Sequence, residues 1–201
     1  MSFIKETDWI ARHQQQVEKN GGKRPTLPPA VIVETPRLML REMTPADYDD
    51  LCEILQDEQA MYAYAHAFSQ EECRAWLQNQ FHRYETYGFG LWAVLDKESG
   101  AWLGQCGLTL QDWNGDRVLE VGYLFKRRYW HHGYATEAVK GCMDYAFDVL
   151  QADEVCSIIR DNNFASQAVA KRNGLVPFDT MVKHYYHIDM PHIRFIKRRE
   201  N

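Results

Sequence analysis

Three apolar segments follow one another between residues 89 and 125, separated only by short turns. They are Phe89–Leu95, Ala101–Leu110 and Arg117–Phe125, and the turns contain Lys-Glu-Ser-Gly and Trp-Asn-Gly-Asp. Asn-Gly is a strong signal for a tight hairpin, because both residues tolerate positive φ. Strands spaced this closely pair antiparallel, since a parallel crossover needs about a dozen residues or more. We therefore expect an antiparallel meander. Its third strand would place four apolar side chains on one face: Leu119, Val121, Tyr123 and Phe125.

The pattern changes after this meander. Apolar residues recur at helical spacing through Ala135–Leu150, Glu154–Ile159 is a short apolar strand, and Ser166–Asn173 is a short helix that Gly174 ends. The last segment, roughly 180–197, suits two more strands. This alternation of strands and helices implies that two strands of this half pair in parallel, with helices over the sheet.

The part of the chain before the meander predicts one strand and two helices. Val31–Met43 alternates well enough for a first strand. Thr44, followed by Pro-Ala-Asp, supplies the cap, the proline and the acidic residue that open a helix. Ser69 repeats this capping pattern, and its helix can run to Tyr87 before Gly88 ends it. The fold class is therefore expected to be α+β, with a mixed, mostly antiparallel sheet of six or seven strands and about four helices on its faces.

Residues 1–30 differ from the rest of the chain. A short helix is expected from Asp8 to Asn20, and the three prolines between Lys23 and Pro29 predict an extended linker. A chain of 201 residues favours one domain over two. We interpret 1–30 as an N-terminal appendage and 31–201 as the domain.

Composition excludes several classes of protein. The 23 lysines and arginines face 28 aspartates and glutamates, and the resulting net charge of -5 argues against bulk nucleic-acid binding. No apolar run approaches the length of a membrane span. Lys5, Glu6 and Asp8 stand where a signal peptide would need an apolar core, so we expect a cytoplasmic protein.

Cysteine and histidine spacing argues against a metal site. The five cysteines include no C-x-x-C pair, which favours reduced, mostly buried thiols over disulfides or zinc ligands. His184, His187 and His192 lie in one segment, but a strand turns His184 and His187 to opposite faces. We expect no metal, and instead a substrate-pocket role for one of the histidines or tyrosines of this segment.

The stretch from Leu124 to Ala138 is the most informative in the chain. A strand ends, a loop with one glycine follows, and a well-formed helix begins. The free amides and the dipole of a helix start suit a pyrophosphate. The plainer interpretation is a simple connection in which Thr136 or a nearby group caps the helix. Neither G-x-x-x-x-G-K-[ST] nor G-x-G-x-x-G occurs, which excludes a P-loop and a dinucleotide fold.

Three motifs in order carry a resemblance to a known family. Glu120-Val-Gly-Tyr-Leu precedes Tyr129-Trp-x-x-Gly-Tyr-Ala-Thr-Glu-Ala; Glu34-Thr-Pro-Arg-Leu-Met-Leu-Arg lies upstream; Asn163-Phe-Ala-Ser and Lys171-Arg-Asn-Gly-Leu lie downstream. Over about residues 31–196 the chain resembles the GNAT superfamily of N-acetyltransferases, and is most similar to the branch named for acetylating ribosomal-protein N-termini. His131 stands where the family usually has glycine, and Trp130 where it has glutamine or arginine.

The resemblance implies acetyl-CoA as cosubstrate and a place for each of its parts. Backbone amides would hold the pyrophosphate; the residues are His131, His132, Gly133, Tyr134, Ala135 and Thr136. The pantetheine arm would lie along a splayed strand at Tyr123, Leu124 and Phe125, where the Leu124 amide would polarise the thioester carbonyl. Asn163 would contact the pantetheine. Lys126, Arg127 and Arg128 have two open interpretations, as countercharges for the phosphates or as a solvated basic turn.

Two side chains are candidates for the chemistry itself. By the resemblance, Ser166 would donate to the departing thiolate; the alternative is a plain N-cap of its helix. Glu120 lies in an otherwise apolar strand, where burial would raise the pKa of its carboxyl and suit it to accept the amine's proton. The alternatives for Glu120 are a salt bridge with a buried arginine or an edge-facing surface position.

The sequence therefore predicts an N-acetyltransferase that transfers acetyl directly from acetyl-CoA to a primary amine, either a protein N-terminus or a small molecule. The loops at 61–68 and 180–192 would receive the acceptor. The alternative from another class is a non-catalytic acyl-CoA-binding module that recruits a partner through residues 1–30. We expect no nucleic-acid or membrane partner, and a monomer or homodimer.

Overall fold

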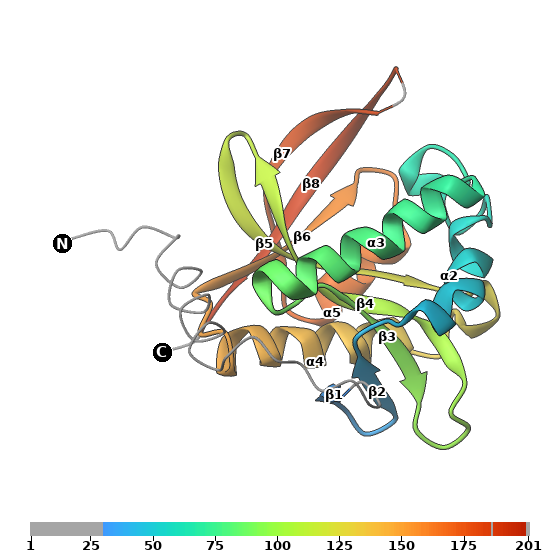
Figure 1. Cartoon of the computed structure of the whole chain (residues 1–201). Helices are drawn as coiled ribbons and strands as arrows, with labels where there is room; N and C mark the ends of the chain where they lie inside the picture. Colours follow the sequence, from blue (N-terminus) through green and yellow to red (C-terminus); the bar gives the residue numbers. More distant parts are fainter. Residues whose placement is uncertain (1–29, 186, 200–201) are drawn as a thin grey trace.

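The computed structural model describes residues 30–185 and 187–199, so the helix and linker expected between Asp8 and Pro29 lie outside the described residues. Eight strands form one sheet in the order β1-β2-β3-β4-β5-β6-β8-β7 (Figure 1). Their bounds are β1 Val31–Glu34, β2 Leu38–Arg41, β3 Leu91–Asp96, β4 Trp102–Trp113, β5 Asp116–Phe125, β6 Glu154–Arg160, β7 Val176–Tyr185 and β8 Ile188–Arg198. All neighbours pair antiparallel except β5 and β6. The expected mixed, mostly antiparallel sheet is confirmed, with eight strands.

The additional strand comes from 31–43, where the expectation of one continuous strand is wrong. Thr35-Pro36-Arg37 turns the chain, and the Thr35 amide donates to the Leu38 carbonyl at 3.0 Å. The Leu38 amide in turn donates to Thr35 Oγ1 at 3.0 Å. Proline has no N–H for a ladder, so the strand breaks into the antiparallel pair β1 and β2.

The helix predicted after Ser69 begins and ends where its capping residues predict. α3 (Gln70–Tyr87) opens with a capping box in which the Ser69 amide donates to Glu72 Oε2 at 2.8 Å and the Glu72 amide to Ser69 Oγ at 3.2 Å. Gly88 ends it with φ 76°. The remaining α-helices are α2 Tyr48–Leu55, α4 Tyr134–Asp148 and α5 Phe164–Arg172, and the 3₁₀ turns are η1 Pro45–Asp47, η2 Tyr62–Tyr64 and η3 Arg127–Tyr129.

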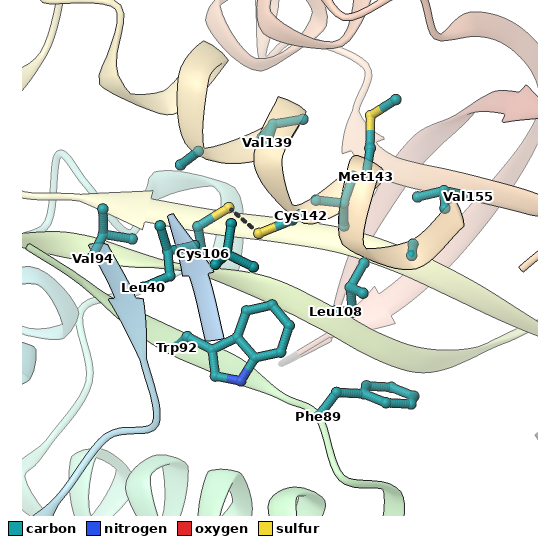
Figure 2. Packing of buried hydrophobic residues seen from close by; sticks show 14 of the residues in the cluster. Leu40, Phe89, Trp92, Val94, Cys106, Leu108, Val139, Cys142, Met143 and Val155 are labelled. Atoms are coloured by element: carbon teal, nitrogen blue, oxygen red, sulfur yellow. Dashed lines mark hydrogen bonds between the residues drawn. The ribbon is translucent and has the colours of Figure 1, made fainter. Parts of the chain in front are cut away.

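The sheet is covered on both faces, because side chains alternate along each strand. In β3, Trp92 and Val94 pack with α4 and α5, whereas Leu91 and Ala93 pack with α2 and α3. Figure 2 shows the α4 side, where the buried thiols Cys106 and Cys142 lie 3.6 Å apart. The five cysteines are buried and free, as the spacing predicted.

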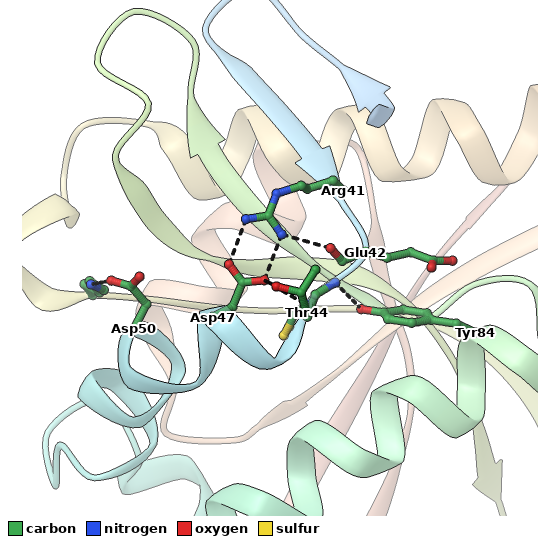
Figure 3. Close-up of polar contacts among 8 residues, drawn as sticks. Arg41, Glu42, Thr44, Asp47, Asp50 and Tyr84 are labelled. Atoms are coloured by element: carbon green, nitrogen blue, oxygen red, sulfur yellow. Dashed lines mark hydrogen bonds and ion pairs between the residues drawn. The ribbon is translucent and has the colours of Figure 1, made fainter. Parts of the chain in front are cut away.

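One anchor holds η1 and the start of α2 against the end of β2 (Figure 3). Buried Asp47 accepts two bonds from the Arg41 guanidinium, at 2.7 and 2.8 Å, and a third from the Thr44 amide at 2.7 Å. The Tyr84 hydroxyl accepts from the Met43 amide at 3.2 Å and donates to the Leu91 carbonyl. This anchor joins β2, α2 and α3.

Among the strands of the described residues only β5 and β6 are parallel neighbours, and they are paired at a single position, Glu120 with Cys156. Beyond that pair the two strands separate, although each remains paired on its other side, β5 with β4 and β6 with β8. The parallel pairing expected in this half is therefore confirmed, but it is brief, and the sheet opens near its middle. Within the described residues, no helix is long and apolar enough to cross a membrane.

Candidate active site

A cleft of about 830 Å³ passes through this opening in the sheet. On the side of α4 and α5 it is lined by the loop before α4 and by the start of α5; we call this the cofactor half. On the side of α3 it is lined by η2, α3 and the β7–β8 hairpin; we call this the acceptor half. All predicted site residues except His132 line the cleft: Glu120, Tyr123, Leu124, Phe125, His131, Gly133, Tyr134, Ala135, Thr136, Asn163 and Ser166.

The loop before α4 exposes backbone amides. The first hydrogen bond of the helix runs from the Glu137 amide to the Gly133 carbonyl at 3.1 Å, so the amides of residues 134–136 have no acceptor within the helix. Gly133 is the N-cap and no side chain caps the helix, so the plainer interpretation of Thr136 as a cap is wrong. His131 has φ 64° and Gly133 φ 79°. The left-handed backbone explains why glycine is favoured at 131, and histidine adopts it at modest cost.

The β1–β2 turn braces this loop through residues that the sequence reasoning did not single out for the site. Glu137 Oε1 accepts from Thr35 Oγ1 at 2.6 Å and from the Arg37 amide at 2.8 Å, and Glu137 Oε2 accepts from Arg37 Nε at 2.6 Å. Arg37 also donates to the His132 carbonyl at 3.1 Å and stacks on Tyr134 at 4.6 Å. The sequence signal that could have identified this brace was the presence of both motifs, Thr35-Pro-Arg37 and Thr136-Glu137, because side chains of the two motifs meet here.

A prediction follows from this brace. Burial alone would raise the pKa of Glu137, but the bonds from Thr35 and Arg37 lower it below the ordinary value. The Glu137→Gln variant keeps one acceptor oxygen but loses the ion pair, so the loop should be held less firmly. We expect CoA to bind roughly 3- to 10-fold more weakly by calorimetry, the scale of one charge-assisted hydrogen bond. Unchanged affinity in a folded variant would show that the brace does not shape the loop.

The three basic residues after β5, at 126–128, form ion pairs within the protein. This supports neither the interpretation as countercharges for the phosphates nor the interpretation as a solvated basic turn. Lys126 is buried, with Nζ 2.5 Å from Asp50 and 2.6 Å from Glu53. Arg127 contacts Asp57 at 2.5 Å, and Arg128 contacts Glu53. These bonds fix the strand-to-helix connection to α2 and to the turn that follows it, and carboxylates already balance the three charges.

The ladder between β4 and β5 decides which backbone groups of β5 face the cleft. The Lys126 amide donates to the Leu103 carbonyl at 3.0 Å, and the register continues without a shift to Leu124 opposite Gln105. Because ladder bonds alternate along an antiparallel strand, the Leu124 amide is directed toward β4. The expectation that the Leu124 amide polarises the thioester carbonyl is therefore wrong. The Tyr123 amide lies on the edge that faces β6, where the strands have separated.

Asn163 and Ser166 lie at the start of α5. Asn163 is the N-cap, and its Oδ1 accepts from the Ser166 amide at 3.1 Å. The alternative interpretation of Ser166 as the cap is therefore wrong, because Ser166 is the third residue of the helix. Its carbonyl accepts from the Tyr123 hydroxyl at 3.4 Å. The Tyr123 hydroxyl also interacts with the Ser166 side chain, and Ser166 lines the cleft, where its hydroxyl can donate.

Glu120 stands where the β5–β6 ladder ends. Its Oε1 accepts from the Ile158 amide at 3.2 Å. The carboxylate thus replaces the backbone carbonyl that would accept this bond if the β5–β6 pairing continued. Its Oε2 accepts from Thr109 Oγ1 at 3.4 Å, and Thr109 accepts from Gln111 at 3.0 Å. Within the described chain it has no ion pair, and it is half-buried rather than at an edge, so both alternatives made from the sequence are wrong. Burial raises the pKa of Glu120, against the opposing effects of Lys183, the Ile158 amide, Arg83 and Thr109.

The acceptor half contains residues from both loops expected there. Tyr62, Tyr64 and Phe68 line it from the first loop, and Lys183, Tyr185 and His192 from the second. His184 instead contacts Asp189 at 2.5 Å near the exposed hairpin tip. Trp76, Arg83, Gln111 and Arg160 also line this half; local sequence patterns contain no signal for them. In the described ranges, no three His, Cys, Asp or Glu side chains are grouped to hold a metal ion.

Comparison with known proteins identifies relatives over most of the chain. A family model described as an acetyltransferase (GNAT) domain matches residues 37–176. YkkB of Bacillus subtilis is 36% identical over 142 residues, which is 70% of this chain and 83% of YkkB. The region matched by the family model contains the loop before α4, Glu120 and the start of α5.

Solved structures share the fold at low identity. A GNAT-family acetyltransferase from Bacillus anthracis has a TM-score of 0.71 at 17% identity, covering 83% of this chain and 97% of that one. RimL, a ribosomal-protein α-N acetyltransferase in complex with coenzyme A, has a TM-score of 0.66 at 18% identity, covering 84% and 98%. At these identities the likeness shows the fold alone.

Proposed function

Because this chain belongs to the GNAT acetyltransferase family, we propose that it transfers an acetyl group from acetyl-CoA directly to a primary amine. The family uses acetyl-CoA, and the structural neighbour RimL is described as acting on a ribosomal-protein N-terminus. The proposal includes an acetyltransferase domain at 31–201 with 1–30 as its appendage.

The residues of the cofactor half fit acetyl-CoA. The left-handed turn at His131 and Gly133 and the free amides of 134–136 suit a pyrophosphate. The unpaired edges of β5 and β6 offer ladder positions to the amide groups of a pantetheine arm. The bound thioester supplies an activated acetyl group, and the Tyr123 amide is the backbone donor best directed to polarise its carbonyl.

The reaction forms one C–N bond and breaks one C–S bond. The amine must lose a proton, and we assign Glu120 to accept it, directly or through one water. The Ser166 hydroxyl would donate to the sulfur as negative charge develops there, and Asn163 fixes that helix start. Transfer is direct, with no covalent intermediate on the protein.

One observation carries the proposal: a single cleft joins the two faces of the sheet where β5 and β6 separate. Glu120 lies on the face of the sheet that α3 covers, because it alternates along β5 with Leu119 and Val121, which pack on the α4 side. Ser166 belongs to α5, which packs on that α4 side. An amine and a thioester can therefore approach each other from opposite sides without either crossing the core.

The test is release of free thiol from acetyl-CoA in the presence of a panel of primary amines and peptides with free N-termini. Amine-dependent release together with an acetylated product by mass spectrometry would support the transferase. Tight CoA binding with no release from any amine would contradict it and favour the non-catalytic acyl-CoA-binding module.

Ser166→Ala tests stabilisation of the leaving group. Removing a hydroxyl that contacts the sulfur as charge develops should lower kcat roughly 10- to 100-fold while leaving CoA affinity nearly unchanged. Helix stability should hold, because Asn163 rather than Ser166 is the cap. Ser99→Ala, on an exposed turn, is the matched control. Full turnover in the Ser166→Ala variant would remove Ser166 from the chemistry.

A further inference from the structure

Three cationic side chains line the acceptor half, each from a different element: Arg83 of α3, Arg160 of β6 and Lys183 of β7. Glu120 is the only carboxylate among the residues that line the described cleft. The acceptor half therefore has an excess of positive charge, in a chain whose net charge is -5.

In residues 30–185 and 187–199 none of these cations forms a salt bridge, although the charge of Glu120 acts on Arg83 and Lys183 from a greater distance. Arg83 donates to Gln80 Oε1 at 3.2 Å, and Arg160 donates to the Tyr62 carbonyl at 2.8 Å. Arg160 Nε is buried without a hydrogen-bond partner in the same ranges. Burial also lowers the pKa of Arg83, which Glu120 only partly offsets. Each side chain thus retains hydrogen-bonding capacity toward the cleft's occupant.

Cations buried elsewhere in the protein are paired. Lys126 has Asp50 and Glu53, and the Arg194 guanidinium lies 2.7 Å from Asp179. A buried charge without a partner is costly, so such pairing is the ordinary solution. The three cations of the acceptor half are half-buried and lie in one cleft without such a partner, which is the arrangement expected of groups that bind an anionic ligand.

An aromatic wall lies beside them. The ring centroids of Tyr64 and Trp76 are 5.8 Å apart, those of Phe68 and Trp76 are 5.7 Å apart, and all three residues line the cleft with Tyr62. Edge-to-face packing fixes these rings as a preformed apolar surface. A ligand that uses both features has an anionic group and an apolar body.

Building on the proposed transferase function, we propose that the acceptor is an amine that also carries a carboxylate and an apolar side chain, as a free amino acid does. The carboxylate would be bound by the three cations, with the amine toward Glu120 and the side chain against the aromatic wall. Aromatic rings also attract cations, so a polyamine is the competing acceptor. Three unpaired positive charges would repel it.

The direct test is binding, which does not depend on turnover. Calorimetry in the presence of CoA would compare N-acetyl-L-phenylalanine with N-acetyl-L-phenylalaninamide, which differ only in the carboxylate. We expect the acid to bind roughly 10- to 100-fold more tightly, the range of charge-assisted contacts to a carboxylate. Equal binding, or tighter binding of the amide, would overturn the proposal.

Charge-neutralising variants assign the preference to residues. Arg83→Gln and Lys183→Gln should each reduce the acid-over-amide ratio severalfold, with amide affinity little changed. Lys140→Gln is the matched control, because Lys140 is exposed on α4 and pairs with Asp144. It removes the same charge far from the acceptor half and should leave the ratio intact. A ratio unaffected by either cleft variant would contradict the assignment.

Turnover separates failure of this inference from failure of the function. Thiol release would be measured with L-phenylalanine, L-phenylalaninamide and spermidine. A preference for L-phenylalanine supports the inference, whereas faster release with the amide or spermidine overturns it and leaves the transferase standing. If no amine in the wider panel gave thiol release, both the inference and the proposed function would be overturned.

Discussion

Replacing Glu120 by glutamine is expected to lower kcat/KM roughly 10²- to 10⁴-fold, the range for loss of a general base. Glutamine keeps the shape of the side chain and can still accept the Ile158 amide, but it cannot take the amine's proton. Burial raises the pKa of Glu120, so the acidic limb of the parent's pH profile should lie above that of an exposed glutamate. Activity needs the ionised form and should fall as pH falls through that pKa.

The variant should lose this acidic limb as well as its rate. Glu98→Gln, the same substitution on an exposed turn, should alter neither. A slow Glu120→Gln variant with the limb unchanged would indicate that Glu120 only positions the amine. A variant as active as the parent would end the case for Glu120.

Stability gives an independent check on the Glu120→Gln variant. The folded-state pKa of Glu120 is raised, so its protonated form contributes stability at low pH that is lost as pH rises through that pKa. At neutral pH the ionised, half-buried carboxylate therefore lowers the free energy of unfolding. The variant should be at least as stable as the parent at neutral pH, and its advantage should disappear below the ordinary glutamate pKa of 4.5. Loss of activity would then not reflect unfolding.

Asp47→Ala is expected to lower the free energy of unfolding by roughly 2–4 kcal/mol, because it breaks a buried ion pair and the capping-box bond from the Thr44 amide. The change removes both bonds from Arg41 and the bond from the Thr44 amide (Figure 3). Chemical denaturation at neutral pH would measure the difference in the free energy of unfolding. Burial opposes ionisation, but Arg41 and Thr44 lower the pKa of Asp47 below its ordinary 3.8. Its contribution is thus present above that pH and lost as pH falls through the lowered pKa.

The control for this prediction is an exposed ion pair of similar chemistry. Asp144 accepts from Lys140 one turn away on α4 at 2.7 Å, and both side chains are exposed. Asp144→Ala should change stability by only about 0.5 kcal/mol. If Asp47→Ala were no more destabilising than Asp144→Ala, the anchor between β2 and α2 would contribute no more than an exposed ion pair.

Local signals in the sequence predicted much of the fold. α3 has the predicted bounds because the Ser69 capping box and Gly88 determine its ends within a few residues. Asn114 and Gly115 both have positive φ in the β4–β5 turn, as the Asn-Gly signal requires. Val31–Met43 was wrongly predicted as one strand, because its alternating pattern concealed the turn at Pro36. The helix expected from Ser166 begins at Phe164, because Asn163 is its cap.

The site was less predictable because its details depend on contacts between distant segments. The direction of the Leu124 amide is set by the register of β4 against β5, which periodicity along one strand cannot reveal. The partners of Lys126 lie on α2, more than 70 residues earlier in the chain. The unpaired state of Arg83 and Lys183 emerges only when α3 and β7 meet across the cleft.

The single pair between β5 and β6 has a consequence for how the backbone exchanges its hydrogens with solvent. Amides deep inside a large sheet ordinarily exchange slowest, and those on its outer strands fastest. Here the Tyr123 amide belongs to an interior strand but faces an opening instead of a neighbouring strand. The Ile158 amide opposite is shielded by one carboxylate rather than by a ladder. We therefore expect these two interior amides to take up deuterium faster than the ladder amides of β4 and β8, and a ligand that fills the cleft to slow this uptake.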